Sequence, residues 1–344
     1  MPSIAQTLLD VQRAKSEKGD KFGAAVVDLI RVYGDALNLL DWETIGTVET
    51  MARRSNSIAE LAFREGRGAD FSGIDGPGYD QVTDSVWHLG GKVKIDKIDL
   101  KDKKAPDILM DKTRFAIRGL VHKFNDQFIN GDHATEPHGF EGLNVRLLNG
   151  FGNTVYGNSS SAELDVRASA APSEATLYTF LDKIDEAIEE CDGGTPDVAF
   201  TSGDFIATLR SVLRRLGKYT AQPEQEPGKY NELPGRRSFA QKQNRPALIY
   251  PTDKGVKWYD LGFKRDQTTR VIANETVNSV GCRPVYFAKL GRDYLSGIQM
   301  YPVETTGPDR LDDMLTWQVM VDWPLGIRTV HNRTLAKLAG VRVA

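Results

Sequence analysis

Residues 128–143 read FINGDHATEPHGFEGL and are the most informative stretch of the chain. It begins inside a helical pattern and continues into polar and glycine-rich sequence. Asn130 and Gly131 readily take the left-handed conformation that ends many helices. Pro137 keeps the helix from resuming, because it lacks a backbone N–H and its ring clashes with the preceding turn. Two glycines then allow tight backbone geometry around Phe140. The stretch therefore predicts a helix end followed by a rigid turn.

A long amphipathic helix is predicted immediately before this turn. From Asp107 to about Ile129, apolar residues recur mostly at three- and four-residue spacing, and Pro106 suits a first helical turn. Such a helix is roughly 35 Å long at 1.5 Å per residue. With a single apolar stripe, it is expected to lie along a sheet or another helix. The stripe consists of Met110, Ile117, Leu120, Val121, Phe124 and Phe128.

The helix and turn together resemble one known family. The pattern F-I-N-G-D, then P-x-G-F-E-G-L, is similar to the end of the spine helix in major capsid proteins of tailed bacteriophages, which have the Hong Kong 97 fold. The resemblance runs from about residue 25 to the C-terminus and is most specific in the quoted stretch. It implies an α+β fold made of an N-terminal arm (1–42), a strand and extended E-loop (43–104), a peripheral domain (105–171 and 310–334) with its spine helix (107–129), and an axial domain (172–309 and 335–344).

Residues 1–40 contain two helical patterns with apolar faces. They fit either a two-helix cap on the core or, by the resemblance, an arm that lies along neighbouring subunits. Residues 43–51 then predict a strand, and after a glycine-rich loop the chain returns through 82–87 and 92–100. A lone hairpin is marginally stable in water. We therefore expect residues 64–100 to bury little within their own subunit and to pack on a neighbour.

The second half of the chain alternates helices and strands. Ser173 predicts the N-cap of a helix that has an apolar stripe and an acidic opposite face, and Gly193 and Gly194 follow its end. A second helix is predicted from Ser202 to Gly217. Residues 144–172 show no clear register, and residues 218–245 predict a long loop. Strands are predicted at 196–200, 247–250, 256–261, 285–290 and 295–300, and the last clear strand at 316–323 leads into 326–330 and the tail 335–341.

We find no motif for catalysis or cofactor binding. The patterns GxxxxGK[ST], GxGxxG and GxSxG do not occur. Four potential metal ligands lie within residues 133–141, but they straddle a proline turn and lack the regular spacing of a zinc site. We interpret these four as solvated turn residues: His133, Glu136, His138 and Glu141. The prediction is that the protein is not an enzyme and has no catalytic, cofactor-binding or metal-ligating residues.

Composition is that of an ordinary globular protein. The 344 residues are 40% hydrophobic and 26% charged, and the net charge of −3 argues against a strongly basic nucleic-acid reader. We interpret the basic run Lys101–Lys104 as a solvated strand end. Two cysteines, Cys191 and Cys282, do not make a disulfide framework, and we expect both to be buried in a protein of a reducing compartment. Neither a signal peptide nor an apolar run of roughly 20 residues is present.

The resemblance implies an architectural function. Copies of the chain would assemble as hexamers and pentamers into an icosahedral shell around double-stranded DNA, in the virion after assembly in the host cytoplasm. The matching region begins near Met1, so a separate scaffolding protein is expected beside a portal, and a decoration protein is left open. DNA contacts would be weak and non-specific, with no membrane partner. An encapsulin-type nanocompartment shell and a soluble enzyme of unrecognised class remain as alternatives.

Overall fold

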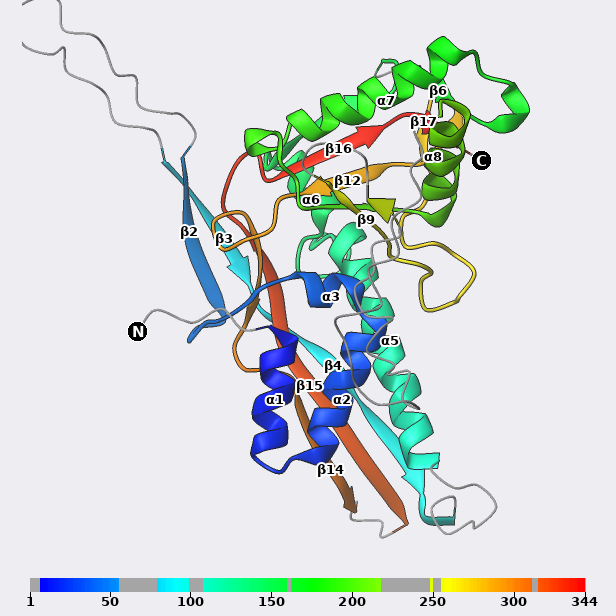
Figure 1. Ribbon diagram of the computed structural model, residues 1–344. Helices are drawn as coiled ribbons and strands as arrows, with labels where there is room; N and C mark the ends of the chain where they lie inside the picture. Colours follow the sequence, from blue (N-terminus) through cyan, green and yellow to red (C-terminus); the bar gives the residue numbers. More distant parts are fainter. Residues whose placement is uncertain are drawn as a thin grey trace, which may run out of the picture.

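The computed structural model describes residues 7–55, 79–98, 108–159, 162–217, 248–249, 255–310 and 315–343. Figure 1 shows an upper part built on a sheet beneath helices α7 and α8, and an elongated lower part in which α5 lies beside β4 and β15. The β2–β3 hairpin projects from the side of the molecule. The described ends of the chain therefore contribute to different parts: α1 and α2 to the lower part, β16 to the upper.

The predicted spine helix is confirmed as α5, Ile108–Asn130. In its apolar stripe, Ile117, Phe124 and Phe128 are at most 1% exposed. Tight turns follow its end: the N–H of Gly131 donates to Gln127 O (2.9 Å), and the N–H of Gly142 donates to Gly131 O (2.8 Å). The Gln127 side-chain amide also donates to Phe140 O at 2.8 Å. These bonds hold the turn rigidly against the helix it follows.

The helix ends where it was predicted to end, but the expected left-handed conformation at Asn130 and Gly131 is wrong. Neither Asn130 nor Gly131 has a positive φ, and Asn130 is still helical. The glycines are needed instead because backbone passes very close to backbone. A Cβ at Gly131 would lie 2.4 Å from Gln127 O, and one at Gly142 would lie 2.6 Å from the same oxygen. Any side chain at either position would have to push the two segments apart.

The lower part contains a five-stranded sheet. The predicted strands at 316–323 and 326–330 form one 14-residue strand, β15, which pairs with β4 from Thr316↔Asp96 to Leu325↔Trp87. The strand predicted at 43–51 is divided into β1 and β2. The sheet contains β1 (Trp42–Thr44), β13 (Leu295–Gln299), β15 (Thr316–Thr329), β14 (Glu304–Arg310) and β4 (Trp87–Asp96).

A hairpin is present where it was predicted. β2 (Glu49–Ser55) pairs antiparallel with β3 (Tyr79–Ser85), and the connecting residues 56–78 lie outside the described residues. Within the segment expected to bury little, β4 pairs along its whole length with β15 of the same subunit, yet Ile95 is its one buried side chain. The run Lys101–Lys104 also lies outside the described residues.

The N-terminal helices pack on the core of their own subunit, which fits the two-helix cap that the sequence left open beside the arm. In α2, Val26, Val27 and Ile30 are at most 1% exposed, and α2 packs against α5. Trp42 contacts Phe124 and Trp323, with ring centroids 6.2 and 4.7 Å apart. The apolar stripe of α2 is thus covered by its own subunit. The helices are α1 (Leu8–Glu17), α2 (Lys21–Tyr33) and α3 (Asp35–Leu39).

The upper part is a six-stranded sheet covered on one face by two helices. Phe180 of α7 contacts Phe205 of α8 at 5.6 Å, and Phe205 stacks on Trp258 at 5.9 Å. Ser173 caps α7 as predicted, and Gly217 after α8 has φ +67°. The elements are α7 (Glu174–Glu189), α8 (Gly203–Arg215) and, in sheet order, β5 (Gly152–Tyr156), β16 (Leu335–Ala339), β12 (Val285–Ala288), β7 (Val198–Thr201), β9 (Lys257–Asp260) and β8 (Leu248–Ile249).

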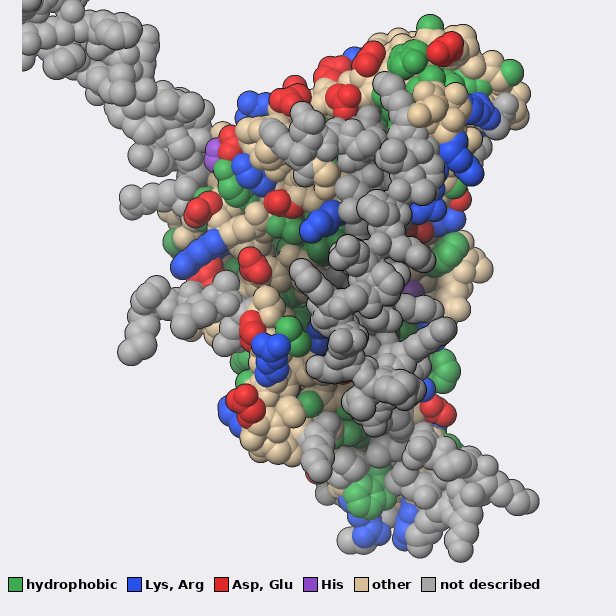
Figure 2. Space-filling model, in the orientation of Figure 1, with side chains coloured by type: hydrophobic (Ala, Val, Ile, Leu, Met, Phe, Trp, Pro, Cys, Tyr) green, Lys and Arg blue, Asp and Glu red, His purple; other side chains and the backbone are tan. Residues whose placement is uncertain are grey.

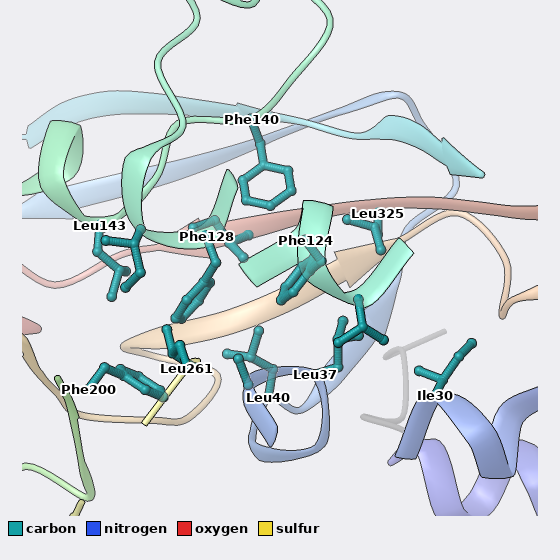
Figure 3. Packing of buried hydrophobic residues seen from close by; sticks show 14 of the residues in the cluster. Ile30, Leu37, Leu40, Phe124, Phe128, Phe140, Leu143, Phe200, Leu261 and Leu325 are labelled. Atoms are coloured by element: carbon teal, nitrogen blue, oxygen red, sulfur yellow. The ribbon is translucent and has the colours of Figure 1, made fainter. Parts of the chain in front are cut away.

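The other face of this sheet meets the end of α5, so the two parts share a core. Phe128 lies edge-on to Phe200 at 5.4 Å. Figure 3 shows Phe124, Phe128 and Phe140 between the N-terminal helices and the sheet, with Leu37 and Leu40 pointing toward them. The short helix α6 (Leu143–Leu148) was not predicted from the sequence. The remaining elements are α6 (Leu143–Leu148), β6 (Leu164–Asp165), η1 (Ala168–Ala170), η2 (Asp192–Gly194), β10 (Glu275–Val277), β11 (Val280–Cys282) and β17 (Val341–Arg342).

Asp35, at the start of α3, provides a pH-dependent prediction. Burial, together with the nearby Asp260 carboxylate, raises the pKa of Asp35 to about 6 from 3.8. The folded state therefore keeps a proton that the unfolded state has lost, and stability falls as pH rises from about 4 to 6. We expect Asp35→Asn to raise the free energy of unfolding by about 1–2 kcal/mol at pH 7.5, with the gain disappearing near pH 4.

Urea unfolding across this pH range measures the effect. Asp41→Asn, at an exposed site close by, is the matched control and should change little at any pH. A gain from Asp35→Asn that is the same at pH 4 and pH 7.5 would show that ionisation is not its cause.

Candidate functional site

The four potential metal ligands of the turn are used separately. The imidazoles of His133 and His138, both exposed, contact the Trp87 ring with centroids 5.8 and 5.9 Å away. Glu136 forms an ion pair with Lys123 at 2.6 Å, and the side chain of Glu141 accepts a hydrogen bond from Asn149. Within the described part of the chain, no three His, Cys, Asp or Glu side chains are grouped to hold a metal ion.

The cysteines are buried, as predicted. Cys191 and Cys282 are both 0% exposed, and burial raises the pKa of the Cys191 thiol to about 12. A thiol with this pKa stays protonated near neutral pH and is a poor nucleophile. Both side chains therefore fill the core.

In the part of the chain that is described, none of the helices has the length and apolarity needed to cross a membrane.

A buried arginine with four hydrogen bonds lies at the root of the β2–β3 hairpin. Arg146 is 3% exposed. Its Nη2 donates to Asp84 Oδ1 at 2.6 Å and to Ile327 O at 3.0 Å. Its Nη1 donates to Thr329 Oγ1 at 3.2 Å, and its Nε donates to Glu141 O at 3.0 Å. One buried guanidinium thus joins the hairpin, strand β15 and the turn after α5. We define this group as the hairpin root.

Sequence reasoning missed the hairpin root. Helical spacing places Arg146 on the same side of α6 as Leu143, three residues earlier, so it points inward. A lone arginine in the otherwise apolar run of residues 145–148 was the available signal. A buried charge in such a run must be paired. The partner could not be identified, because Asp84 is 62 residues away.

A second buried carboxylate joins distant segments in the lower part. Glu43, on β1, is 7% exposed. Its Oε1 accepts a hydrogen bond from Arg292 at 2.8 Å, and its Oε2 forms an ion pair with Arg328, also at 2.8 Å. The strand that follows the N-terminal helices is thereby fixed to β15, which makes this segment part of the subunit body.

Two kinds of surface remain for partners. The outer face of α7 is acidic and solvated, as predicted, with Asp182, Asp185 and Glu186 exposed, and Figure 2 shows acidic side chains along the upper edge of the molecule. Large apolar side chains are exposed in two other regions. Met51 (68%), Val48 (57%) and Leu148 (82%) lie on the hairpin and α6, and Ile98 (76%), Phe115 (68%) and Leu315 (61%) lie on β4, α5 and β15 or directly beside them.

No protein-family model matches this sequence, and no curated protein matches it either. Solved structures do match. The capsid of an empty GTA particle is 11% identical, with a TM-score of 0.55 and 90% of each chain covered. Microbacterium phage Oxtober96 is 12% identical, with a TM-score of 0.55 and 90% and 91% covered. The holo-SrpI encapsulin complex from Synechococcus elongatus PCC 7942 is 14% identical, with a TM-score of 0.50 and 89% and 86% covered.

At these identities the matches show a shared fold. The α+β fold of the Hong Kong 97 type that the sequence predicted is therefore confirmed. The coverage shows that the similarity extends over most of each chain and is not confined to the spine helix and its turn.

Proposed function

We propose that this chain is a shell-forming structural protein, and more specifically a major capsid protein whose hexamers and pentamers close into an icosahedral shell around double-stranded DNA. The observation that carries the proposal is the fold shared with capsid structures over about 90% of both chains. Stability in such a shell comes from interfaces on the order of 1,000 Å² or more, repeated by symmetry. A catalytic role is not part of the proposal.

The described surface supports this reading. The hairpin projects from the body (Figure 1), and the buried Arg146–Asp84 pair holds its root. A projecting element with a rigid root can reach another copy at a defined angle. The peripheral and axial domains expected from the sequence remain part of the proposal, with residues 7–42 added to the body. The virion location, assembly in the host cytoplasm, the scaffolding protein and the portal are also proposals, and a decoration protein stays open.

A deletion within the segment that connects β2 and β3 tests the proposal. We expect the purified full chain to form closed shells visible by electron microscopy. Removing residues 66–78 should leave folded subunits that do not form stable shells, because a contact repeated in every copy is lost. Thermal unfolding of unassembled subunits is the control and should be nearly unchanged. Normal shells from the deletion would show that the hairpin is dispensable, and a wild-type chain that stays monomeric under all assembly conditions would favour the enzyme alternative.

Contact with packaged DNA is expected to be weak. The net charge is −3, so scattered phosphate contacts would supply the binding, with steep dependence on salt and no preference among duplex sequences. Fluorescence anisotropy with several duplexes at several salt concentrations measures both properties. A tight, sequence-selective complex at physiological salt would contradict a role in confinement.

One alternative has a specific observation in its favour. The match to the SrpI encapsulin complex supports a nanocompartment shell. The contents of shells purified from the native source separate the two functions. Nuclease-protected DNA inside them would support the capsid, and a single packaged enzyme without DNA would support the nanocompartment.

A further inference from the structure

The two helices that cover the upper sheet carry opposite charges. Helix α7 contains five carboxylates and a single lysine. From Phe205 to its end, α8 contains three arginines and no acidic residue. Figure 2 shows acidic side chains along the upper edge of the molecule and basic side chains at the end of the upper part where Figure 1 places α8. One subunit therefore presents two oppositely charged faces in different places.

We define the two faces by their residues. The acidic face is an outward stripe of α7 whose members recur at three- or four-residue spacing and are all exposed: Glu174, Tyr178, Asp182, Asp185 and Glu189. The arginine end is formed by the last turns of α8 and contains Arg210, Arg214 and Arg215.

The stability of α7 itself does not account for its acidic face. Carboxylates three or four residues apart on a helix repel each other, and the helix dipole disfavours negative charge in the last turn, where α7 has no basic residue. The single lysine pairs with Glu186 at 2.5 Å, and Arg333 donates to the backbone carbonyls of Glu189 and Glu190. Among the described residues, no ion pair neutralises Asp182 or Glu189. These carboxylates therefore favour a cation from outside the subunit.

The residue types on both faces fit a contact between proteins. Tyr178 is 40% exposed and lies one turn from both Glu174 and Asp182. Arginine binds carboxylates through parallel hydrogen bonds and stacks on aromatic rings, so carboxylates one turn from an exposed tyrosine suit a guanidinium. On α8, the exposed Arg214 and Arg215 form no ion pair with a carboxylate of the described residues. We propose that the acidic face of one copy binds the arginine end of a second copy.

This contact is head-to-tail. Two acidic faces repel each other, as do two arginine ends, so a symmetric contact between identical faces is disfavoured. A contact between unlike faces is heterologous and generates a ring where the rotation closes. Duplex DNA would fit the arginine end but not the acidic face, whereas a second copy accounts for both. The inference rests on the proposed shell function, and it adds which helices join neighbouring subunits within a ring.

Charge reversal tests the inference. The first variant, Asp182→Lys/Glu189→Lys, makes the acidic face basic, and the second, Arg214→Glu/Arg215→Glu, makes the arginine end acidic. We expect each variant alone to stay folded and to give a yield of closed shells lower by at least about tenfold, because like charges then face each other across the contact. A chain with all four substitutions should recover the yield. Electron microscopy of assembled material and thermal unfolding of unassembled subunits measure the two effects.

A mixture of the two variants tests the head-to-tail geometry. The first variant has two basic faces and the second has two acidic ones, so subunits of the two variants must alternate around a ring. A ring of six allows this alternation and a ring of five does not. We expect the mixture to form hexamers in native mass spectrometry, without pentamers and without closed shells.

The control is Glu17→Lys/Asp41→Lys, which changes the net charge as the first variant does, at exposed positions outside both faces. It should assemble normally. Normal shells from either charge-reversal variant would overturn the inference. So would a failure of both the fourfold variant and the mixture to recover assembly, which would assign the charged faces to another partner. All these outcomes are scored against wild-type shells, so they are distinct from a failure of wild-type assembly, which would overturn the proposed function.

Discussion

Arg146→Met is expected to lower the free energy of unfolding of the unassembled subunit by about 3–5 kcal/mol, because removing one partner of a buried ion pair leaves the other charge uncompensated. Arg146 and Asp84 are 3% and 5% exposed, and their closest N–O distance is 2.6 Å. The substitution also removes the donors to the carbonyls of Ile327 and Glu141. Urea unfolding of unassembled subunits is the measurement.

The double variant Asp84→Leu/Arg146→Met distinguishes the cost of an unpaired buried charge from the cost of losing the other contacts of Arg146. Replacing both charges with apolar groups should recover much of the loss, because no buried charge is then left alone. Arg114→Met is the control, since Arg114 makes an exposed pair with Asp111 at 3.6 Å and should cost at most about 1 kcal/mol. A double variant as unstable as the single would show that the backbone contacts of Arg146, and not the ion pair, hold the hairpin root.

Phe124→Ala is expected to cost about 3–5 kcal/mol of subunit stability, as large-to-small changes in a core do. The Phe124 side chain is 0% exposed and contacts Trp42, Phe128 and Phe140. A cavity there would face three segments at once, which limits how far the surroundings can relax (Figure 3). Thermal and urea unfolding of unassembled subunits measure the loss.

The same helix supplies the control. Phe115 is 68% exposed on α5, so Phe115→Ala should change subunit stability by no more than about 0.5 kcal/mol. If Phe124→Ala left the unfolding midpoint unchanged and impaired only assembly, the apolar stripe of α5 would face a partner instead of the core.

Local sequence patterns predicted helices and strands well where a single hydrophobic period, about 3.6 residues for a helix or 2 for a strand, runs through the whole segment. The stripe of α5, the Ser173 cap of α7 and most strands of the upper sheet follow from spacing within one element. Segments that mix periods were predicted poorly. Residues 144–172 contain a short helix and short strands, and each is too brief to show a period of its own. The hairpin was placed correctly, but its second strand was confused with β4, since both alternate.

Local spacing predicted which faces of the long helices are apolar and about where those helices begin and end, because these properties depend on neighbours three or four residues away. The burial of the cysteines was predicted from the residue type. Which residues cover each apolar helix face could be learned only from the tertiary structure. The apolar stripe of α2 is buried in its own subunit and not on a neighbour. Arg146 pairs with Asp84, which is 62 residues away in the sequence, and Glu43 pairs with Arg292, which is 249 residues away. Spacing shows that a face or charge must be covered, but the partner depends on the path of the whole chain, which no local period records.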